Sequence, residues 1–156
     1  MATLDRFLFK KSEADAADKA EINKRFIDMV AELPANEFSF KLHFRQMKDI
    51  PNAMALPGGD VVVTDALLEL VENSDELDSI LLHEMGHVIE RHGLQHAVQA
   101  SAVSVIVALA FGDLSGIGEI GVGVPVFLLQ SSYSRRRETE ADTFAFARMS
   151  SEFVTP

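Results

Sequence analysis

The sequence LLHEMGHVIERH, residues 81–92, is an apolar, helix-forming run that contains the pattern His-Glu-x-x-His. Residues four apart on an α-helix lie about 40° from each other around the axis, so His83 and His87 project from one face. Two imidazoles placed in this way can hold one zinc ion at about 2.0–2.1 Å. Glu84 then lies beside a metal-bound water, where its carboxylate can take a proton as the water attacks a carbonyl carbon. The pattern predicts a zinc-binding helix; the alternative is a helix that carries two histidines by coincidence.

Length and composition fit one globular domain. The 156 residues can bury a single core, and hydrophobic and charged contents of 47% and 24% are ordinary for folded proteins. Because no cysteine is present, any metal must be held by His, Asp or Glu, and the redox compartment stays undetermined. The formal net charge of −10 argues against nucleic acid as a partner, since a phosphate-binding surface needs a basic field.

No segment of the sequence predicts a transmembrane helix. The most apolar region, residues 102–130, is interrupted by Asp113 and Glu119 and by glycines clustered between positions 112 and 123. The N-terminus has no apolar signal core. The chain as given is therefore expected to be soluble, in a compartment and oligomeric state that the sequence leaves open. The apolar region is a candidate surface for docking on lipid, on further helices or on a second copy.

Apolar residues at three- and four-residue steps predict that most of the chain is helical. The expected helices lie at residues 12–33, 64–71, 74–93, 94–111, 124–129 and 134–149. Ser12, Thr64 and Ser74 are the expected N-caps of the first three. Gly93 is the expected stop of the helix that carries the His-Glu-x-x-His pattern.

Two shorter regions predict a sheet. Residues 38–45 alternate strictly between apolar and polar, which predicts a half-buried strand in which His43 faces solvent rather than a metal. Prolines flank an extended piece that contains Asn52, Ala53, Met54 and Ala55, so a position at the sheet edge is favoured. A hairpin connects this piece to a buried strand at 61–63. The prediction is an α+β fold with a small antiparallel sheet at one side of a helical body.

A catalytic zinc usually has three protein ligands and one position open to water. Some His-Glu-x-x-His enzymes place a third His six residues after the second, but Gly93 stands there in this chain. His92 lies about 140° around the helix from His87, so His92 and His96 are expected on the surface or in support of a ligand. The third ligand is therefore expected from a separate segment.

Glu138 is the best candidate for that ligand. Glu138 and Asp142 are four residues apart and share a helical face. One carboxylate can bind metal while the other orients the imidazole of His83 or His87 through a hydrogen bond. The pattern alone fits a charged, solvated helix face equally well.

His83-Glu84-Met85-Gly86-His87, followed by Ser134-Arg135-x-x-Glu138-x-x-Ala141-Asp142, resembles the gluzincin family that contains the HtpX-type and CAAX-prenyl-type proteases. Residues 52–64 resemble the edge strand and hairpin of that family, so the resemblance runs from about residue 52 to 142. It implies a mostly helical, zincin-like metallopeptidase domain with one Zn²⁺ held by His83, His87 and Glu138. It further implies that Glu84 is the general base, that Asp142 orients a ligand, and that residues 52–55 pair with a peptide or protein substrate as an added strand.

The implied activity is that of a zinc-dependent endopeptidase, in which zinc-bound water attacks the peptide carbonyl with the help of Glu84. Such families usually carry transmembrane helices and continue beyond the second metal-binding helix. Residues 1–156 are therefore expected to be one catalytic domain, either a fragment of a longer, membrane-associated prokaryotic protein that lacks its C-terminal part here or a very small member of the family. No His follows His96 to steady the oxyanion, which leaves Tyr133 or an Arg of the 135–137 run. The alternatives are a zinc- or peptide-binding module without turnover, and a helical domain without metal.

Overall fold

A computed structural model of the protein describes residues 9–34, 37–48, 50–98 and 135–152. Its helices are α2 (Ala16–Ala31), α3 (Asp65–Leu70), α4 (Ser74–Ile89) and α7 (Arg135–Glu152), and residues 92–98 are also helical. Its strands are β1 (Lys10–Lys11), β2 (Lys41–Gln46), β3 (Ala53–Ala55) and β4 (Asp60–Thr64). The α+β class is confirmed. Within these described ranges, no helix is long and apolar enough to cross a membrane. The helices expected over 99–111 and 124–129, the glycine-rich link between them and Tyr133 lie outside the described residues.

The sheet has the strand order β1-β2-β4-β3, which places β3 at an edge as the sequence predicted. The expectation of an antiparallel sheet is correct for β1 with β2 and for β3 with β4, but wrong for β2 with β4, which are parallel. The reason lies in the connection: the hairpin makes β4 antiparallel to β3, and β4 then inserts between β3 and β2. The sheet is therefore mixed.

The helix N-caps differ from the sequence prediction at two of the three positions. Thr64 caps α3 as expected, with its hydroxyl accepting a hydrogen bond from the backbone N–H of Leu67 at 3.3 Å. Asn73 caps α4 in place of Ser74, and Asp15 caps α2 in place of Ser12. Ser12 instead donates its hydroxyl hydrogen bond to Asp65 at 2.6 Å. Where several cap-forming residues are close in sequence, tertiary contacts decide which one begins the helix.

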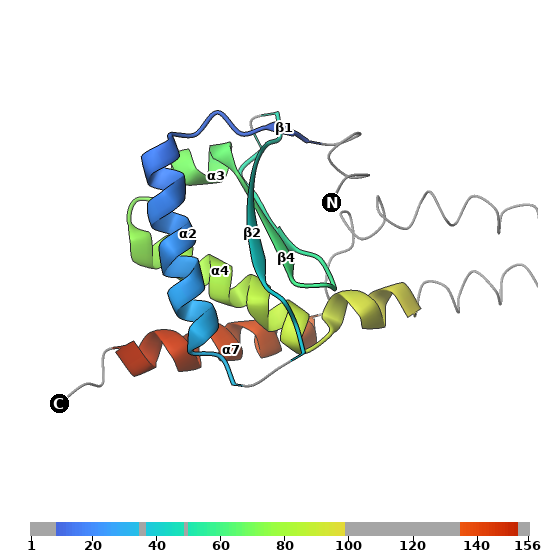
Figure 1. Ribbon diagram of the computed structural model, residues 1–156. Helices are drawn as coiled ribbons and strands as arrows, with labels where there is room; N and C mark the ends of the chain where they lie inside the picture. Colours follow the sequence, from blue (N-terminus) through green and yellow to red (C-terminus); the bar gives the residue numbers. More distant parts are fainter. Residues whose placement is uncertain (1–8, 35–36, 49, 99–134, 153–156) are drawn as a thin grey trace, which may run out of the picture.

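The core lies between the sheet and the helices. Strand β4 is its centre, since Val61, Val62 and Val63 are each fully buried. Phe26 from α2 and Leu81 and Met85 from α4 pack into the same core cluster, together with α7 residues. Figure 1 shows α2 and α4 against the sheet, with α7 lying along α4. This packing fixes α4 between strand β3 and helix α7.

Helices α4 and α7 cross at a very short distance where Gly86 meets Ala141. A Cβ atom built on Gly86 would lie 3.2 Å from the Ala141 Cα and 3.2 Å from the Phe144 Cβ. A Cβ at this position would be packed more tightly than is usual, so α7 would have to move by a few tenths of an ångström to admit it. The two helices run antiparallel, because His83 lies beside Asp142 while His87 lies beside Glu138. The backbone approach at Gly86 therefore determines how close side chains from the two helices come.

Replacing Gly86 with Val is expected to lower the free energy of unfolding by about 1–3 kcal/mol, because its methyl groups would push the helices apart. Urea unfolding of the two proteins would measure the difference. Gly58→Val is the matched control, since a Cβ at Gly58 meets no atom within 4 Å. Equal stability of Gly86→Val and the unaltered chain would show that the helices do not touch at this position.

Helix α4 ends earlier than the expected stop at Gly93. Its last residue is Ile89, Glu90 is the C-cap, and Arg91 takes the left-handed conformation with φ of 56°. A left-handed residue directly after the cap is a common way to end a helix, although Gly is the usual choice there. The chain then turns into the helical run 92–98, which redirects His92.

Candidate active site

Three side chains from two helices converge on one point. His83 and His87 come from α4 and Glu138 comes from α7, and the described residues contain this one group of three or more potential metal ligands, with ligand atoms within 4.8 Å of one another. The Nε2 atoms of the two imidazoles are 3.0 Å apart. The Glu138 carboxylate oxygens lie 3.5 Å from the His83 Nε2 and 3.8 Å from the His87 Nε2.

The three distances of 3.0, 3.5 and 3.8 Å lie on either side of the separations expected for ligands of one zinc ion, so shifts of a few tenths of an ångström would bring the three atoms to a single metal. Ligands at about 2.0–2.2 Å from zinc are separated by roughly 3.3–3.6 Å in tetrahedral geometry. Two imidazole nitrogens and one carboxylate oxygen form a ligand set suited to zinc. Burial, together with the charges of neighbouring His83 and His92, lowers the pKa of His87 from 6.5 to about 4. His87 is therefore neutral near pH 7, as a metal ligand must be.

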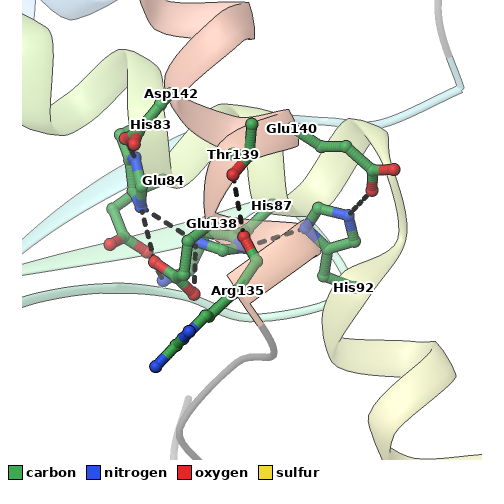
Figure 2. A network of polar contacts seen from close by, with 10 residues as sticks. His83, Glu84, His87, His92, Arg135, Glu138, Thr139, Glu140 and Asp142 are labelled. Atoms are coloured by element: carbon green, nitrogen blue, oxygen red, sulfur yellow. Dashed lines mark hydrogen bonds and ion pairs between the residues drawn. The ribbon is translucent and has the colours of Figure 1, made fainter.

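The outer nitrogen of His83 is oriented by a carboxylate. His83 Nδ1 lies 2.9 Å from the Asp142 Oδ1, so Asp142 holds the ring with Nε2 directed toward Glu138 (Figure 2). The sequence placed Asp142 next to either His83 or His87, and the structure pairs it with His83. A hydrogen bond of this kind fixes the tautomer and the orientation of a metal-ligating imidazole.

Glu84 points to the same region from the side of the sheet. Its Oε2 accepts a hydrogen bond from the backbone N–H of Ala55 at 2.9 Å. Burial of the carboxyl group raises its pKa from 4.5 to about 8; the Ala55 hydrogen bond opposes this rise and the charge of Glu138 adds to it. A carboxyl group with a raised pKa can exchange a proton near neutral pH.

Strand β3 presents alternate backbone groups to its free edge. The residues on either side of β3 bond to β4. The Asn52 carbonyl accepts a hydrogen bond from the Thr64 N–H at 3.0 Å, and the Leu56 N–H donates one to the Asp60 carbonyl at 2.8 Å. The alternation of a strand places the backbone groups of Met54 toward β4 as well, and those of Ala53 and Ala55 outward. Of the four residues expected to pair with a substrate, only Ala53 and Ala55 therefore offer backbone groups at the edge.

Sequence reasoning placed His92 only broadly, on the surface or in support of a ligand, and the structure buries it completely. Its Nδ1 lies 2.9 Å from the His87 Nδ1 and its Nε2 lies 3.0 Å from the Glu140 Oε2. No sequence pattern indicated this position, because it depends on the backbone turn at Arg91, which brings His92 back toward α4.

The remaining candidates lie outside the convergent group, which consists of His83, His87 and Glu138. His43 is half-buried rather than solvated, with its Nε2 2.6 Å from the Asp60 Oδ1. Arg135 is exposed, and its carbonyl oxygen accepts a hydrogen bond from the Thr139 hydroxyl at 2.9 Å. A cavity of about 630 Å³ is lined by α2, α3 and the start of α4; it is rich in carboxylates, and no histidine is among its lining residues. A cavity of about 310 Å³ lies beside His87.

A helix with His-Glu-x-x-His, a carboxylate from an antiparallel helix and an edge strand beside them define a metallopeptidase-type site. Comparison with known proteins identifies the family. The sequence profile of "Peptidase family M48" matches residues 15–155. The chain belongs to this family of zinc metallopeptidases.

Several curated relatives are similar to the chain. The mitochondrial metalloendopeptidase OMA1 of Schizosaccharomyces pombe is 37% identical over 106 residues, which cover 68% of this chain and 32% of the relative. The metalloprotease LoiP of Escherichia coli is 31% identical over 113 residues, covering 70% and 44%. The metalloprotease YcaL of E. coli is 29% identical over 141 residues, covering 84% and 53%. The chain thus spans about a third to a half of the length of these relatives.

Proposed function

We propose that the chain is a zinc-dependent endopeptidase domain, in which His83, His87 and Glu138 hold the metal and Glu84 is the general base. The observation that carries the proposal is the convergence of these three ligand atoms within 4.8 Å of one another. Family membership and the named relatives support the peptidase class.

The chemistry divides between the metal and the protein. A bound zinc ion would supply a Lewis acid for the scissile carbonyl and lower the pKa of the attacking water. Glu84 would accept the proton of that water and pass it to the leaving amine. The positive charge of a bound zinc ion would lower the pKa of Glu84 from its value of about 8 and so favour the ionised carboxylate, which is the form that accepts a proton. The Ala55 N–H would hold the Glu84 carboxylate in position during both transfers.

The substrate would be an extended peptide that adds a strand to β3. The outward backbone groups lie at the edge that faces α4, where the Ala55 N–H is bonded to Glu84, so the groups that would pair with the peptide are the Ala53 N–H and the carbonyls of Ala53 and Ala55. Pairing along this edge would carry a peptide bond past the metal ligands. The cavity of about 310 Å³ beside His87 is lined by Phe38, Leu56, Val88 and Leu94 among others, and would accept an apolar side chain of the peptide.

Ala53→Pro tests the strand pairing, because it removes the outward N–H while an edge strand tolerates Pro. The loss of one backbone hydrogen bond is expected to lower kcat/KM about tenfold for peptide substrates. Ala53→Val keeps the N–H and is the matched control, and zinc affinity should be the same in both variants. Equal kcat/KM for Ala53→Pro and Ala53→Val would contradict substrate pairing at Ala53.

Hydrolysis of a mixed quenched-peptide library by the zinc-loaded chain tests the proposal as a whole. We expect cleavage that stops on chelation and returns when zinc is added. Zinc binding at one ion per chain without cleavage would favour the alternative, a zinc- or peptide-binding module that is latent in this form. Absence of both zinc binding and cleavage would contradict the proposal.

A further inference from the structure

An unbroken line of hydrogen-bonding atoms runs from the carboxylate of Glu140 through the imidazole of His92 to the imidazole of His87. Glu140 Oε2 lies 3.0 Å from the His92 Nε2, and His92 Nδ1 lies 2.9 Å from the His87 Nδ1. His92 is fully buried and His87 is 3% exposed, so both imidazoles depend on protein partners rather than on water. Figure 2 shows this line leaving the convergent group on the side opposite to Asp142.

The order of protons along this line follows from its carboxylate end. Arg136 donates to the other Glu140 oxygen, Oε1, at 2.8 Å, so Glu140 is the carboxylate of an ion pair and its Oε2 faces His92 as an acceptor. An ionised carboxylate only accepts, so a neutral His92 must donate from Nε2 and accept at Nδ1. His87 must then donate from its Nδ1, which leaves the lone pair of its Nε2 directed toward Glu138.

We propose that His92 and Glu140 form a positioning relay that fixes the tautomer and orientation of His87 as a metal ligand. This inference rests on the zinc site proposed above. The relay is the counterpart of the direct Asp142 contact to His83, so α7 would supply one ligand carboxylate and the two carboxylates that orient both histidines. Such supporting hydrogen bonds raise the basicity of the ligand imidazole and reduce the freedom of its ring.

Zinc affinity of the full chain, measured by competition with a chromophoric chelator, tests the relay without reference to catalysis. His92→Phe removes both nitrogens and is expected to weaken zinc binding about 10- to 100-fold. Glu140→Gln keeps the size of this half-buried side chain but allows the opposite proton order, and is expected to weaken binding about 3- to 10-fold. Glu90→Gln removes the same charge from an exposed position outside the relay and should leave the affinity unchanged.

The visible absorption of the cobalt-loaded proteins gives a second readout that a purely structural role would not move. We expect the cobalt bands of Glu140→Gln and His92→Phe to shift, and those of Glu90→Gln to match the unaltered chain. The relay would be overturned if Glu140→Gln bound zinc as tightly as Glu90→Gln with unchanged bands, whether or not His92→Phe folds. Glu138→Ala, measured in the same series, distinguishes failure of the relay from failure of the proposed zinc site. Unchanged zinc affinity in Glu138→Ala would refute His83, His87 and Glu138 as the ligand set.

Discussion

Replacing Glu138 with Ala is expected to lower the zinc affinity of the chain by about 100- to 1000-fold. Structural zinc sites with four ligands bind with about 10–16 kcal/mol, so one ligand contributes roughly 2.5–4 kcal/mol. Glu138 is the one member of the proposed set that comes from α7, and its oxygens lie 3.5 Å and 3.8 Å from the two imidazole nitrogens. Without it, α4 alone would hold the metal through two histidines.

Competition with a chelator measures this loss, and Glu90→Ala is the matched control because Glu90 is an exposed carboxylate at the end of α4. Binding by Glu138→Ala that equals the control would mean that the third ligand is another residue. The pattern in the sequence allowed that outcome, since a solvated helix face fits the charges around Glu138 equally well.

Replacing Glu84 with Gln is expected to lower peptide hydrolysis by about 10²- to 10⁴-fold, the usual contribution of a general base. Zinc affinity should change little, because Glu84 lies outside the convergent group of three ligand atoms. The amide oxygen of Gln can still accept the hydrogen bond from the Ala55 N–H. Comparison of kcat/KM and zinc affinity in the two proteins separates the loss of the base from a loss of metal.

The same substitution is expected to stabilise the metal-free protein near neutral pH. The folded-state pKa of Glu84 is about 8 against an ordinary value of 4.5, so ionisation of Glu84 opposes folding. The stability that the protonated carboxyl supplies is complete below about pH 4.5 and is lost as the pH rises through 8. At pH 7 the raised pKa of Glu84 lowers the free energy of unfolding by on the order of 3 kcal/mol, and replacement with Gln removes this loss.

Thermal unfolding with a chelator present, at pH 4.5 and pH 7, measures this effect. We expect Glu84→Gln to have the higher Tm at pH 7 by several degrees, and the two proteins to agree at pH 4.5. A difference in Tm that is the same at both pH values would show that burial does not perturb the Glu84 carboxyl in the folded protein.

Features that depend on local geometry could be predicted from the sequence. Four-residue spacing places His83 with His87 and Glu138 with Asp142 on single helical faces, whatever the rest of the fold does. Flanking prolines placed β3 at the sheet edge, and the structure has it there.

Features that depend on tertiary context could not be predicted. The parallel pairing of β2 with β4 follows from the insertion of β4 between two strands, which no local pattern encodes. The position of His92 depends on a left-handed Arg91, a conformation for which the sequence gives no cue because Gly is the residue expected there. Even the close approach at Gly86 becomes visible only when Ala141 is placed opposite.

The zinc K-edge X-ray absorption spectrum of the full chain, loaded with one zinc ion per chain, tests the proposed site most directly. A site of His83, His87 and Glu138 predicts two imidazoles and oxygen ligands at about 2.0–2.2 Å, and a changed spectrum in Glu138→Ala. Three or more imidazoles around the zinc, or a spectrum that Glu138→Ala leaves unaltered, would contradict this site.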